Sequence, residues 1–442
     1  MSDVERMSVD DDATVGGKRV RPVSELSRDE LAVLVREYLL GGQLIDRAGM
    51  PHIISAFGRD VMGEIAIEEW MGASPIYTPR IQQLLGFVGD DVETIFKGMQ
   101  FDIGAPPEFM DFRYNVISPD HGEFWLDHCG ALMDVEPLGD DYVFTMCHTI
   151  EDPTFDATAI ATNRRARMSA IHRPPREPAD RQPHCHWEVR IDPDAEPLPD
   201  PDALIEMRSS VLASLPLTSL PLTSLPSASI DSGGDGDWSD YSAPLDPDLR
   251  LEQFAKGVLL TLVDEVGVQY HLLVMSMCRA LERRTDTEKA TEIVGKQFIG
   301  IAGLIAERLC KAFALGDDLT ALAQVLDLHP AFRPRAYVDL FVRSDLDSVI
   351  VELRDCPALG ESGVDSWITL MGSGDRRALD AIAHAVNPRI RIEEGDMPRT
   401  WRAVIDRDAQ PSGEATEVTL AKYSTGASFE FSESPVAVPQ RR

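Results

Sequence analysis

The chain has 442 residues, and its 42 basic and 74 acidic residues give a formal net charge of −32. This charge argues against nucleic acid and anionic membrane surfaces as main partners, because both would repel the protein. Apolar residues make up 43% of the chain, as in folded soluble proteins, and we find no stretch near the roughly 20 uninterrupted apolar residues of a membrane helix.

The first 25 residues are polar and acidic, with no apolar core that would indicate a secretory signal. We predict that residues 1–25 are disordered and that the protein is cytoplasmic. In that reducing compartment its six cysteines are expected to be thiols or metal ligands.

The segment 26–207 is predicted to be an α+β domain that carries the catalytic site. Helix is expected from Ser27, where Ser27 and Glu30 have capping-box spacing before an apolar pattern. Further helices are expected at 51–72 and 88–101. Aromatic and β-branched residues between turn residues predict strands at 122–132, 141–150 and 184–191.

The segment 208–244 is predicted to be a flexible linker. It contains the tandem repeat SLPLTSLPLT, followed by a Gly/Asp/Ser tract. Proline at every fifth position forbids a regular helix, and the second tract cannot bury a core.

Two domains are expected after the linker. A helical domain at 245–330 holds a helix pair, 248–284 and 288–315, whose apolar faces could serve a homodimer. A small α/β domain with a C-terminal hairpin (416–432) is expected at 331–442. Its predicted strands are 337–342, 349–355, 367–371, 389–394 and 400–406, and its predicted helix is 375–386. The fold class is therefore α+β: a helical N-terminal part with a small sheet, a linker, a helix pair and a small α/β layer.

Histidine and cysteine are concentrated in one part of the chain. Six of the ten His and three of the six Cys lie between residues 121 and 186. In the predicted strand 184-HCHWEVRI-191, alternation places His184 and His186 on one face and Cys185 and Trp187 on the apolar one.

Two imidazoles on one strand face can bind one divalent transition metal, such as Zn or Fe. The predicted metal ligands are His128, His148, His184 and His186. A thiol nucleophile with an imidazole base from another strand is the alternative. The candidate catalytic residues are Cys147, Cys129 and Asp152.

The segment of about 60–191 resembles the L-2-amino-thiazoline-4-carboxylic acid hydrolase-like family and, more distantly, vinyl-reductase-like small-molecule modules. The resemblance rests on a helical part followed by Cys129–Gly130, then Cys147–His148 before Glu151–Asp152, then Cys185–His186–Trp187. It implies opening of a small sulfur–nitrogen ring by water, with Cys129, Cys147 and Cys185 at matching positions. The histidines at 128, 148, 184 and 186 depart from the pattern.

Two functions follow as hypotheses. The first is a small-molecule enzyme, a hydrolase that depends on a metal or a thiol. The second is a ligand- or metal-sensing protein whose C-terminal domains signal to a partner. The carboxylates Glu64 and Glu68, one helical turn apart, could belong to the same site or to a solvated face, whereas Glu265 and His271 are expected to be structural.

Overall fold

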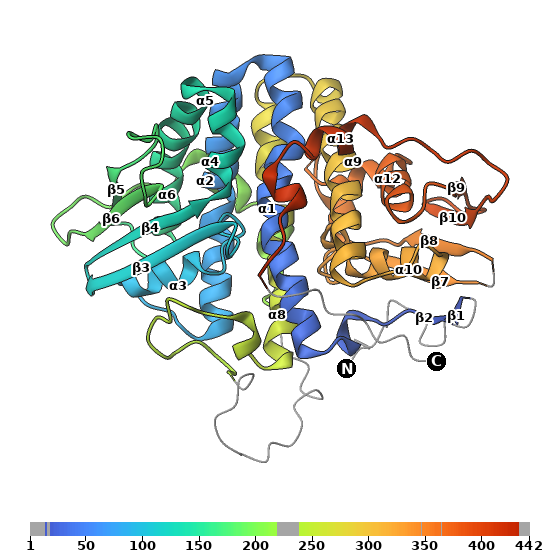
Figure 1. Cartoon of the computed structure of the whole chain (residues 1–442), viewed down its shortest axis with the longest axis horizontal. Helices are drawn as coiled ribbons and strands as arrows, with labels where there is room; N and C mark the ends of the chain where they lie inside the picture. Colours follow the sequence, from blue (N-terminus) through green and yellow to red (C-terminus); the bar gives the residue numbers. More distant parts are fainter. Residues whose placement is uncertain (1–13, 16–17, 219–237, 346, 364, 433–442) are drawn as a thin grey trace, which may run out of the picture.

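Four long helices stand between two four-stranded antiparallel sheets (Figure 1). The computed structural model describes residues 14–15, 18–218, 238–345, 347–363 and 365–432. The structure is 53% helical, which confirms the α+β class. The chain begins with a pair of short strands, β1 (Thr14–Val15) and β2 (Lys18–Arg19).

The first long helix, α1 (Arg28–Phe57), starts at the predicted capping box. The backbone N–H of Glu30 donates to Ser27 Oγ, and the N–H of Ser27 donates to the Glu30 carboxylate. Both bonds satisfy N–H groups that a helix start leaves free. The helix continues through Pro51 to Phe57, so the first residues of the helix expected at 51–72 belong to α1. α2 (Arg59–Leu85) follows after Gly58, whose φ of 87° favours glycine.

The N-terminal sheet has the strand order β3-β4-β6-β5. Its strands are β3 (Met110–Ser118), β4 (His121–Cys129), β5 (Ala166–His172) and β6 (Cys185–Ile191). The short helix α3 (Val92–Met99) precedes it, and α7 (Asp202–Met207) follows it.

The connection between β4 and β5 is helical throughout, so the predicted strand at 141–150 is wrong. It comprises α4 (Gly130–Val135), α5 (Asp140–Phe144), a π-helix (Thr145–Ile150) and α6 (Glu151–Ile160). Val143, Thr145, Cys147 and Ile150 are the buried positions, so the first three alternate as they would in a strand. The aromatic and β-branched residues and this alternation both fit a strand, and the backbone is nevertheless helical.

The C-terminal part repeats this arrangement. Its helices are α8 (Lys256–Glu282), α9 (Thr287–Ala312), α10 (Leu319–Leu328), α11 (Trp367–Gly372), α12 (Arg377–Val386) and α13 (Thr416–Ala421). Its strands are β7 (Leu340–Ser344), β8 (Val349–Leu353), β9 (Ile390–Glu394) and β10 (Thr400–Ile405). The predicted strand 367–371 is helix α11, capped by the Ser366 side chain. The predicted hairpin 416–432 is α13 followed by a 3₁₀ turn (Thr425–Ser428).

The predicted linker is packed at both of its ends. Leu212 and Leu215 are buried, and so is Tyr241, whose N–H donates to the carbonyl of Leu85. The middle of the predicted linker, 219–237, lies outside the described residues, as does most of the N-terminal segment that we predicted to be disordered.

The two halves of the chain have the same topology. Each contains a long helix pair, a short helix, two strands, a helical connection, two strands and a final short helix. The second sheet has the order β7-β8-β10-β9, which matches the first strand for strand. Figure 1 shows the two sheets on opposite sides of the central helices. The fold is therefore an internal duplication.

Matched contacts support the duplication at the residue level. Arg80 on α2 binds Glu265 on α8, with N–O distances of 2.7 and 2.8 Å. Arg308 on α9 binds Glu37 on α1, with distances of 2.7 and 3.0 Å. Arg80 and Arg308 are 228 positions apart, as are Glu37 and Glu265. Each ion pair thus joins the second helix of one half to the first helix of the other.

A second matched contact is the crossing of these helices. A Cβ on Gly72 of α2 would lie 2.2 Å from Ser276 Oγ of α8, and a Cβ on Gly300 of α9 would lie 3.4 Å from the Cβ of Ala48 on α1. Gly72 and Gly300 are again 228 positions apart, as are Ala48 and Ser276. The predicted helical domain 245–330 and α/β domain 331–442 together form the second half, and α1 and α2 cover the helix faces considered for a homodimer.

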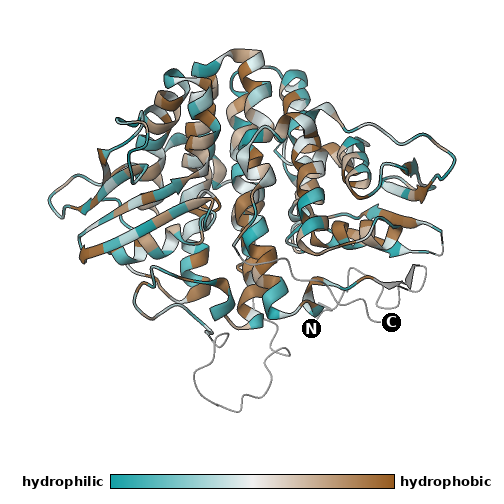
Figure 2. Cartoon of the chain, viewed as in Figure 1, coloured by the Kyte–Doolittle hydropathy of each residue, from teal (hydrophilic) through white to brown (hydrophobic). Residues whose placement is uncertain are grey.

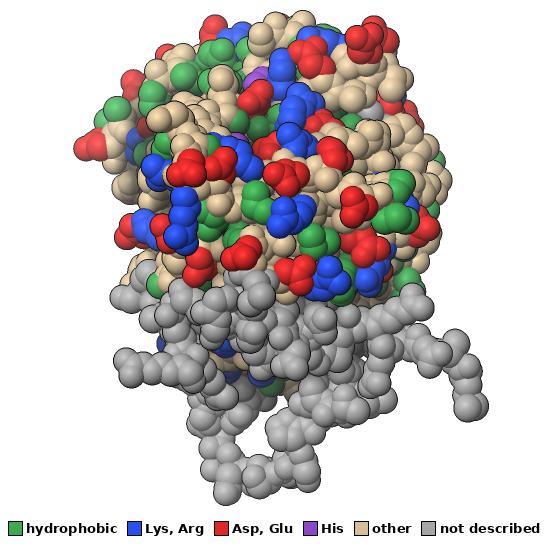
Figure 3. Space-filling view, turned by 90° about the vertical axis from the view of Figure 1, so that its right-hand side faces the viewer, with side chains coloured by type: hydrophobic (Ala, Val, Ile, Leu, Met, Phe, Trp, Pro, Cys, Tyr) green, Lys and Arg blue, Asp and Glu red, His purple; other side chains and the backbone are tan. Residues whose placement is uncertain are grey.

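One helix in the described part of the chain, α8, is long and apolar enough to cross a membrane, and 89% of its apolar window is buried inside the protein. Figure 2 shows hydrophobic residues concentrated on the central helices. On the face seen in Figure 3, acidic side chains lie among basic ones. The C-terminal half contains the ion pairs Arg399–Asp355 and Arg402–Glu393.

Candidate functional site

The strand β6 has the predicted alternation, except at its first histidine. Cys185, Trp187 and Val189 are buried, and His186 lies on the opposite face with its Nε2 3.1 Å from Glu123 Oε2. His184 precedes the strand and is buried, and its Nδ1 accepts a hydrogen bond from the N–H of Cys129 at 3.1 Å. The prediction that His184 and His186 share one exposed face is therefore wrong.

Of the other two predicted ligands, His148 has separate partners, and His128 lies beside His184. His148 lies in the π-helix, where its ring stacks on Phe144 and its Nε2 is 2.7 Å from the carbonyl oxygen of Pro174. The ring of His128 is 5.7 Å from that of His184. Among the described residues, no three His, Cys, Asp or Glu side chains are arranged to hold one metal ion. The four histidines do not form the predicted site, because the strand expected to carry His148 is a helix.

The remaining candidates from the sequence also have structural partners. Asp152 is half exposed and forms an ion pair with Arg173. Glu68 binds Arg284 with an N–O distance of 2.7 Å and also contacts Arg283, while Glu64 is 3.2 Å from Arg284. These two glutamates therefore lie on the outer face of α2, and Glu265 is the partner of Arg80.

The three thiols carried over from the family resemblance do lie close together. Cys129, Cys147 and Cys185 are all buried and interact electrostatically with one another and with Glu151. Burial raises the pKa of Cys129 to about 12, and burial together with Glu151 raises the pKa of Cys147 well above its ordinary value. Both groups are thus neutral thiols at neutral pH, and a neutral thiol is a poor nucleophile.

We expect these three cysteines to be inert towards a thiol-specific disulfide reagent in the folded protein. The test uses a variant in which the partly exposed Cys310 and Cys356 are replaced by serine. Labelling should wait for unfolding in urea, because the thiols are buried and burial keeps them protonated. Rapid labelling of Cys147 in the folded variant would contradict this and restore it as a nucleophile.

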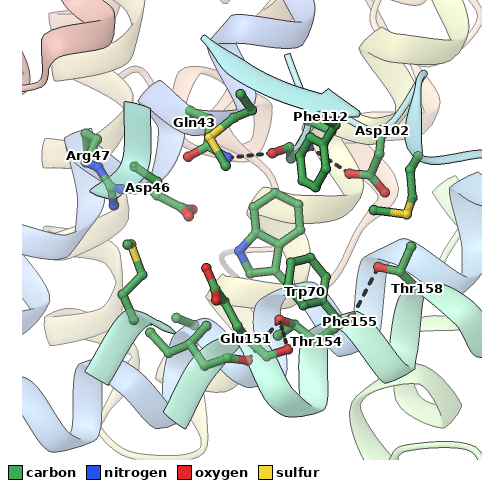
Figure 4. Close-up of a pocket in the computed structure, with 18 of the residues that line it drawn as sticks. Gln43, Asp46, Arg47, Trp70, Asp102, Phe112, Glu151, Thr154, Phe155 and Thr158 are labelled. Atoms are coloured by element: carbon green, nitrogen blue, oxygen red, sulfur yellow. Dashed lines mark hydrogen bonds between the residues drawn. The ribbon is translucent and has the colours of Figure 1, made fainter. Parts of the chain in front are cut away.

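A cavity of about 130 Å³ lies in the N-terminal half, between the helix pair α1–α2, the sheet and the helical connection. Its polar lining residues are Gln43, Asp46, Arg47, Asp102, Glu151, Thr154 and Thr158. Its apolar lining includes Trp70, Phe112, Phe155 and the methionines 50, 99, 110 and 146. Figure 4 shows Asp46 and Glu151 directed towards the middle of the cavity, beside the indole of Trp70.

The acidic groups of the cavity are buried and incompletely hydrogen-bonded. Asp46 on α1 lies beside Glu69 on α2, and one oxygen of each has no hydrogen-bond partner. The same holds for Glu151 Oε2. Asp102 differs, because it accepts hydrogen bonds from the Tyr77 hydroxyl at 2.9 Å and from the N–H of Gly104 at 2.7 Å. Buried polar atoms without partners are costly and call for an explanation.

Burial also shifts the titration of these carboxyl groups. It raises the pKa of Asp46 to about 6 and that of Glu151 to about 8, although Arg47 and Arg173 respectively oppose the shift. Burial and the neighbouring Asp46 raise the pKa of Glu69. Burial raises the pKa of Asp102 to about 6 as well. At neutral pH the Glu151 carboxyl group therefore keeps a proton that a cationic group could replace.

Arg47, the single arginine that lines the cavity, is neutralised by an ion pair with Asp134. Arg47 Nε donates to Asp134 Oδ2 at 3.1 Å, and both side chains are buried. Asp134 also accepts hydrogen bonds from Ser424 Oγ and from the N–H and hydroxyl of Thr425. The wall of the cavity is therefore connected to the C-terminal segment that follows α13.

Comparison of the chain with known protein families, with curated proteins and with solved structures finds no match. The resemblance to the hydrolase-like family stays a prediction. The functional candidates that sequence reasoning missed are Asp46, Glu69 and Asp102. Their signal was present, since Asp46 and Glu69 each interrupt an apolar helix stretch, 44-LIDRAG-49 and 65-IAIEEWMG-72.

Proposed function

We propose that the protein binds a small molecule in the cavity of its N-terminal half. The observation that carries the proposal is the set of unpartnered carboxyl oxygens of Asp46, Glu69 and Glu151 at or beside an aromatic-lined cavity. Ligand sites are typically apolar cavities with a few convergent polar groups, and strongly shifted pKa values cluster at such sites. An engineered apolar cavity of about 150 Å³ binds benzene, so the volume suits a compact ligand.

The connection from Arg47 through Asp134 to Ser424 and Thr425 supports a sensing role. A ligand beside Arg47 would act on an ion pair that also holds the C-terminal segment. Further along, Phe429 packs edge-on against Phe109. Occupancy of the cavity would thus be transmitted to a segment that belongs to the second half of the chain.

Hydrolysis in the same cavity is the second candidate, and Glu151 favours it. A carboxyl group with a pKa of about 8 at a ligand cavity can act as a general acid or base near neutral pH. Replacing Glu151 with Gln should then stop turnover of a bound ester or amide while binding persists. A pure binding protein would release every ligand unchanged in both forms.

The binding proposal is tested by filling the cavity. Ala66 lines it from α2 and is 2% exposed, so Ala66→Phe should occupy the space that a ligand needs. In a thermal-shift screen of small cations, neutral molecules and anions, we expect hits that raise the melting temperature of the wild type and leave that of the variant unchanged.

Circular dichroism checks that the variant is folded. If no compound stabilises the wild type more than Ala66→Phe, the cavity is not a ligand site.

A further inference from the structure

The internal duplication allows the ligand cavity to be compared with its counterpart in the second half. The offset of 228 residues that relates the ion pairs also relates the cavity positions on the helix pair. Glu69 and Trp70 of α2 correspond to Gln297 and Phe298 of α9, and Asp46 of α1 corresponds to Val274 of α8. The second half thus keeps the aromatic ring and replaces both carboxyl groups with neutral side chains.

In the second half, an indole from the chain itself lies against these residues. Trp367 of α11 is fully buried, and its ring stacks on Phe298 with a centroid distance of 4.9 Å and an interplanar angle of 3°. Its indole N–H donates to Gln297 Oε1 at 3.3 Å. In the second half, a flat ring therefore stacks on the counterpart of Trp70, and its N–H group donates to the counterpart of Glu69.

In the N-terminal half, the equivalent helical connection supplies no ring with an N–H donor. The residues that face the cavity from this connection include Ala131, Met146, Ile150 and Phe155, and the only ring among these four is the phenyl group of Phe155. The cavity lies beside Trp70, as the Trp367 indole lies beside Phe298. The second half supplies this ring from its own chain, whereas the first half can bind a ring from solution.

We infer that the ligand is a flat aromatic cation that stacks on Trp70 and donates N–H groups to Glu69 and Asp46. This inference rests on the proposed binding function. We infer a ring because an indole lies at this place in the second half. We infer a positive charge because the first half has the carboxyl groups of Glu69 and Asp46 where the second half has Gln297 and Val274. A cation over an indole face gains additional attraction.

The charges around the cavity support a cationic ligand. Acidic groups face it from α1 (Asp46), from the segment after α3 (Asp102) and from the start of α6 (Glu151), and Glu69 of α2 lies beside Asp46. The basic groups are Arg47, paired with Asp134, and Arg173, which lies near Glu151 and is paired with Asp152. A bound cation would compensate these carboxyl groups in their ionised form, which burial otherwise disfavours.

Three probes of similar size separate ring shape from charge: benzamidine, a flat cation; benzamide, its neutral analogue; and cyclohexanecarboxamidine, a cation without a flat ring. Calorimetric titration should show that benzamidine binds wild-type protein at least about tenfold more tightly than either analogue. Benzamide lacks the charge, and charge-assisted hydrogen bonds are about twice as strong as neutral ones. Cyclohexanecarboxamidine keeps the charge but has no flat ring to stack on the Trp70 indole.

The matched variants are Glu69→Gln, which copies Gln297, and Glu68→Gln on the outer face of α2. Glu69→Gln should remove the preference for benzamidine over benzamide, and Glu68→Gln should retain it. Equal binding of benzamide, equal binding of cyclohexanecarboxamidine, no binding of benzamidine, or the same loss in both variants would each overturn the ligand class. If other compounds still raise the melting temperature of the wild type and not that of Ala66→Phe, the binding function is supported and only the proposed ligand class is wrong.

Discussion

Replacing Arg308 with Met should lower the free energy of unfolding by about 3–5 kcal/mol, the range for removing one partner of a buried ion pair. The guanidinium makes two bonds to Glu37 and three more to the carbonyls of Gly426, Ala427 and Phe429. Its removal leaves the Glu37 carboxylate buried and uncompensated. The change would loosen both the pairing of the two halves and the C-terminal segment.

Urea denaturation measures this effect. The double variant Glu37→Met, Arg308→Met should recover much of the loss, since apolar residues often replace a buried ion pair at little cost. Arg402→Met, which removes an exposed pair with Glu393, is the matched control and should cost at most about 1 kcal/mol. A loss for Arg308→Met no larger than for Arg402→Met would contradict the role of the duplicated ion pairs.

The second large effect concerns Glu151 and pH. Burial raises its pKa from 4.5 to about 8, so the folded state holds a proton that the unfolded state releases above pH 4.5. Stability from this group is therefore fully present below pH 4.5 and is lost as pH rises to about 8. At about 1.4 kcal/mol per pKa unit, the loss is on the order of 4 kcal/mol.

Glu151→Gln removes the ionisation and retains the shape of the side chain. We expect the stability of the variant relative to the wild type to increase between pH 5 and pH 8.5 by that amount, measured by urea denaturation at each pH. Asp46, Glu69 and Asp102 titrate in both proteins, so the difference isolates Glu151. A difference that is independent of pH would show that Glu151 is ionised and paired in the folded protein.

Local signals in the sequence predicted part of this fold correctly. The capping box at Ser27 and the alternation of Cys185, Trp187 and Val189 depend on neighbouring residues only, and both are present in the structure. The strand predicted at 141–150 is wrong, because its aromatic and β-branched residues and the alternate burial of Val143, Thr145 and Cys147 fit a strand, whereas the backbone is helical.

The duplication and the cavity depend on residues far apart in the chain. The halves differ at equivalent cavity positions: Val274 lies at the position equivalent to Asp46, and Gln297 at the position equivalent to Glu69. The density of His and Cys directed attention to residues 121–186. That region contains Glu151, which lines the cavity and is not among the predicted catalytic residues. The predicted ligands His148 and His186 bind separate partners, and only His128 and His184 lie beside each other.

The most direct test of the account is a crystal structure of the protein with benzamidine. It should place the ring parallel to the Trp70 indole, within the roughly 4.5–7 Å between centroids that is typical of stacked rings, with the amidinium directed at Glu69 and Asp46. The Trp367 indole should occupy the equivalent position in the second half. Benzamidine bound only elsewhere, with the side chains of Trp70 and Phe155 closed over the space between them, would contradict the central claim.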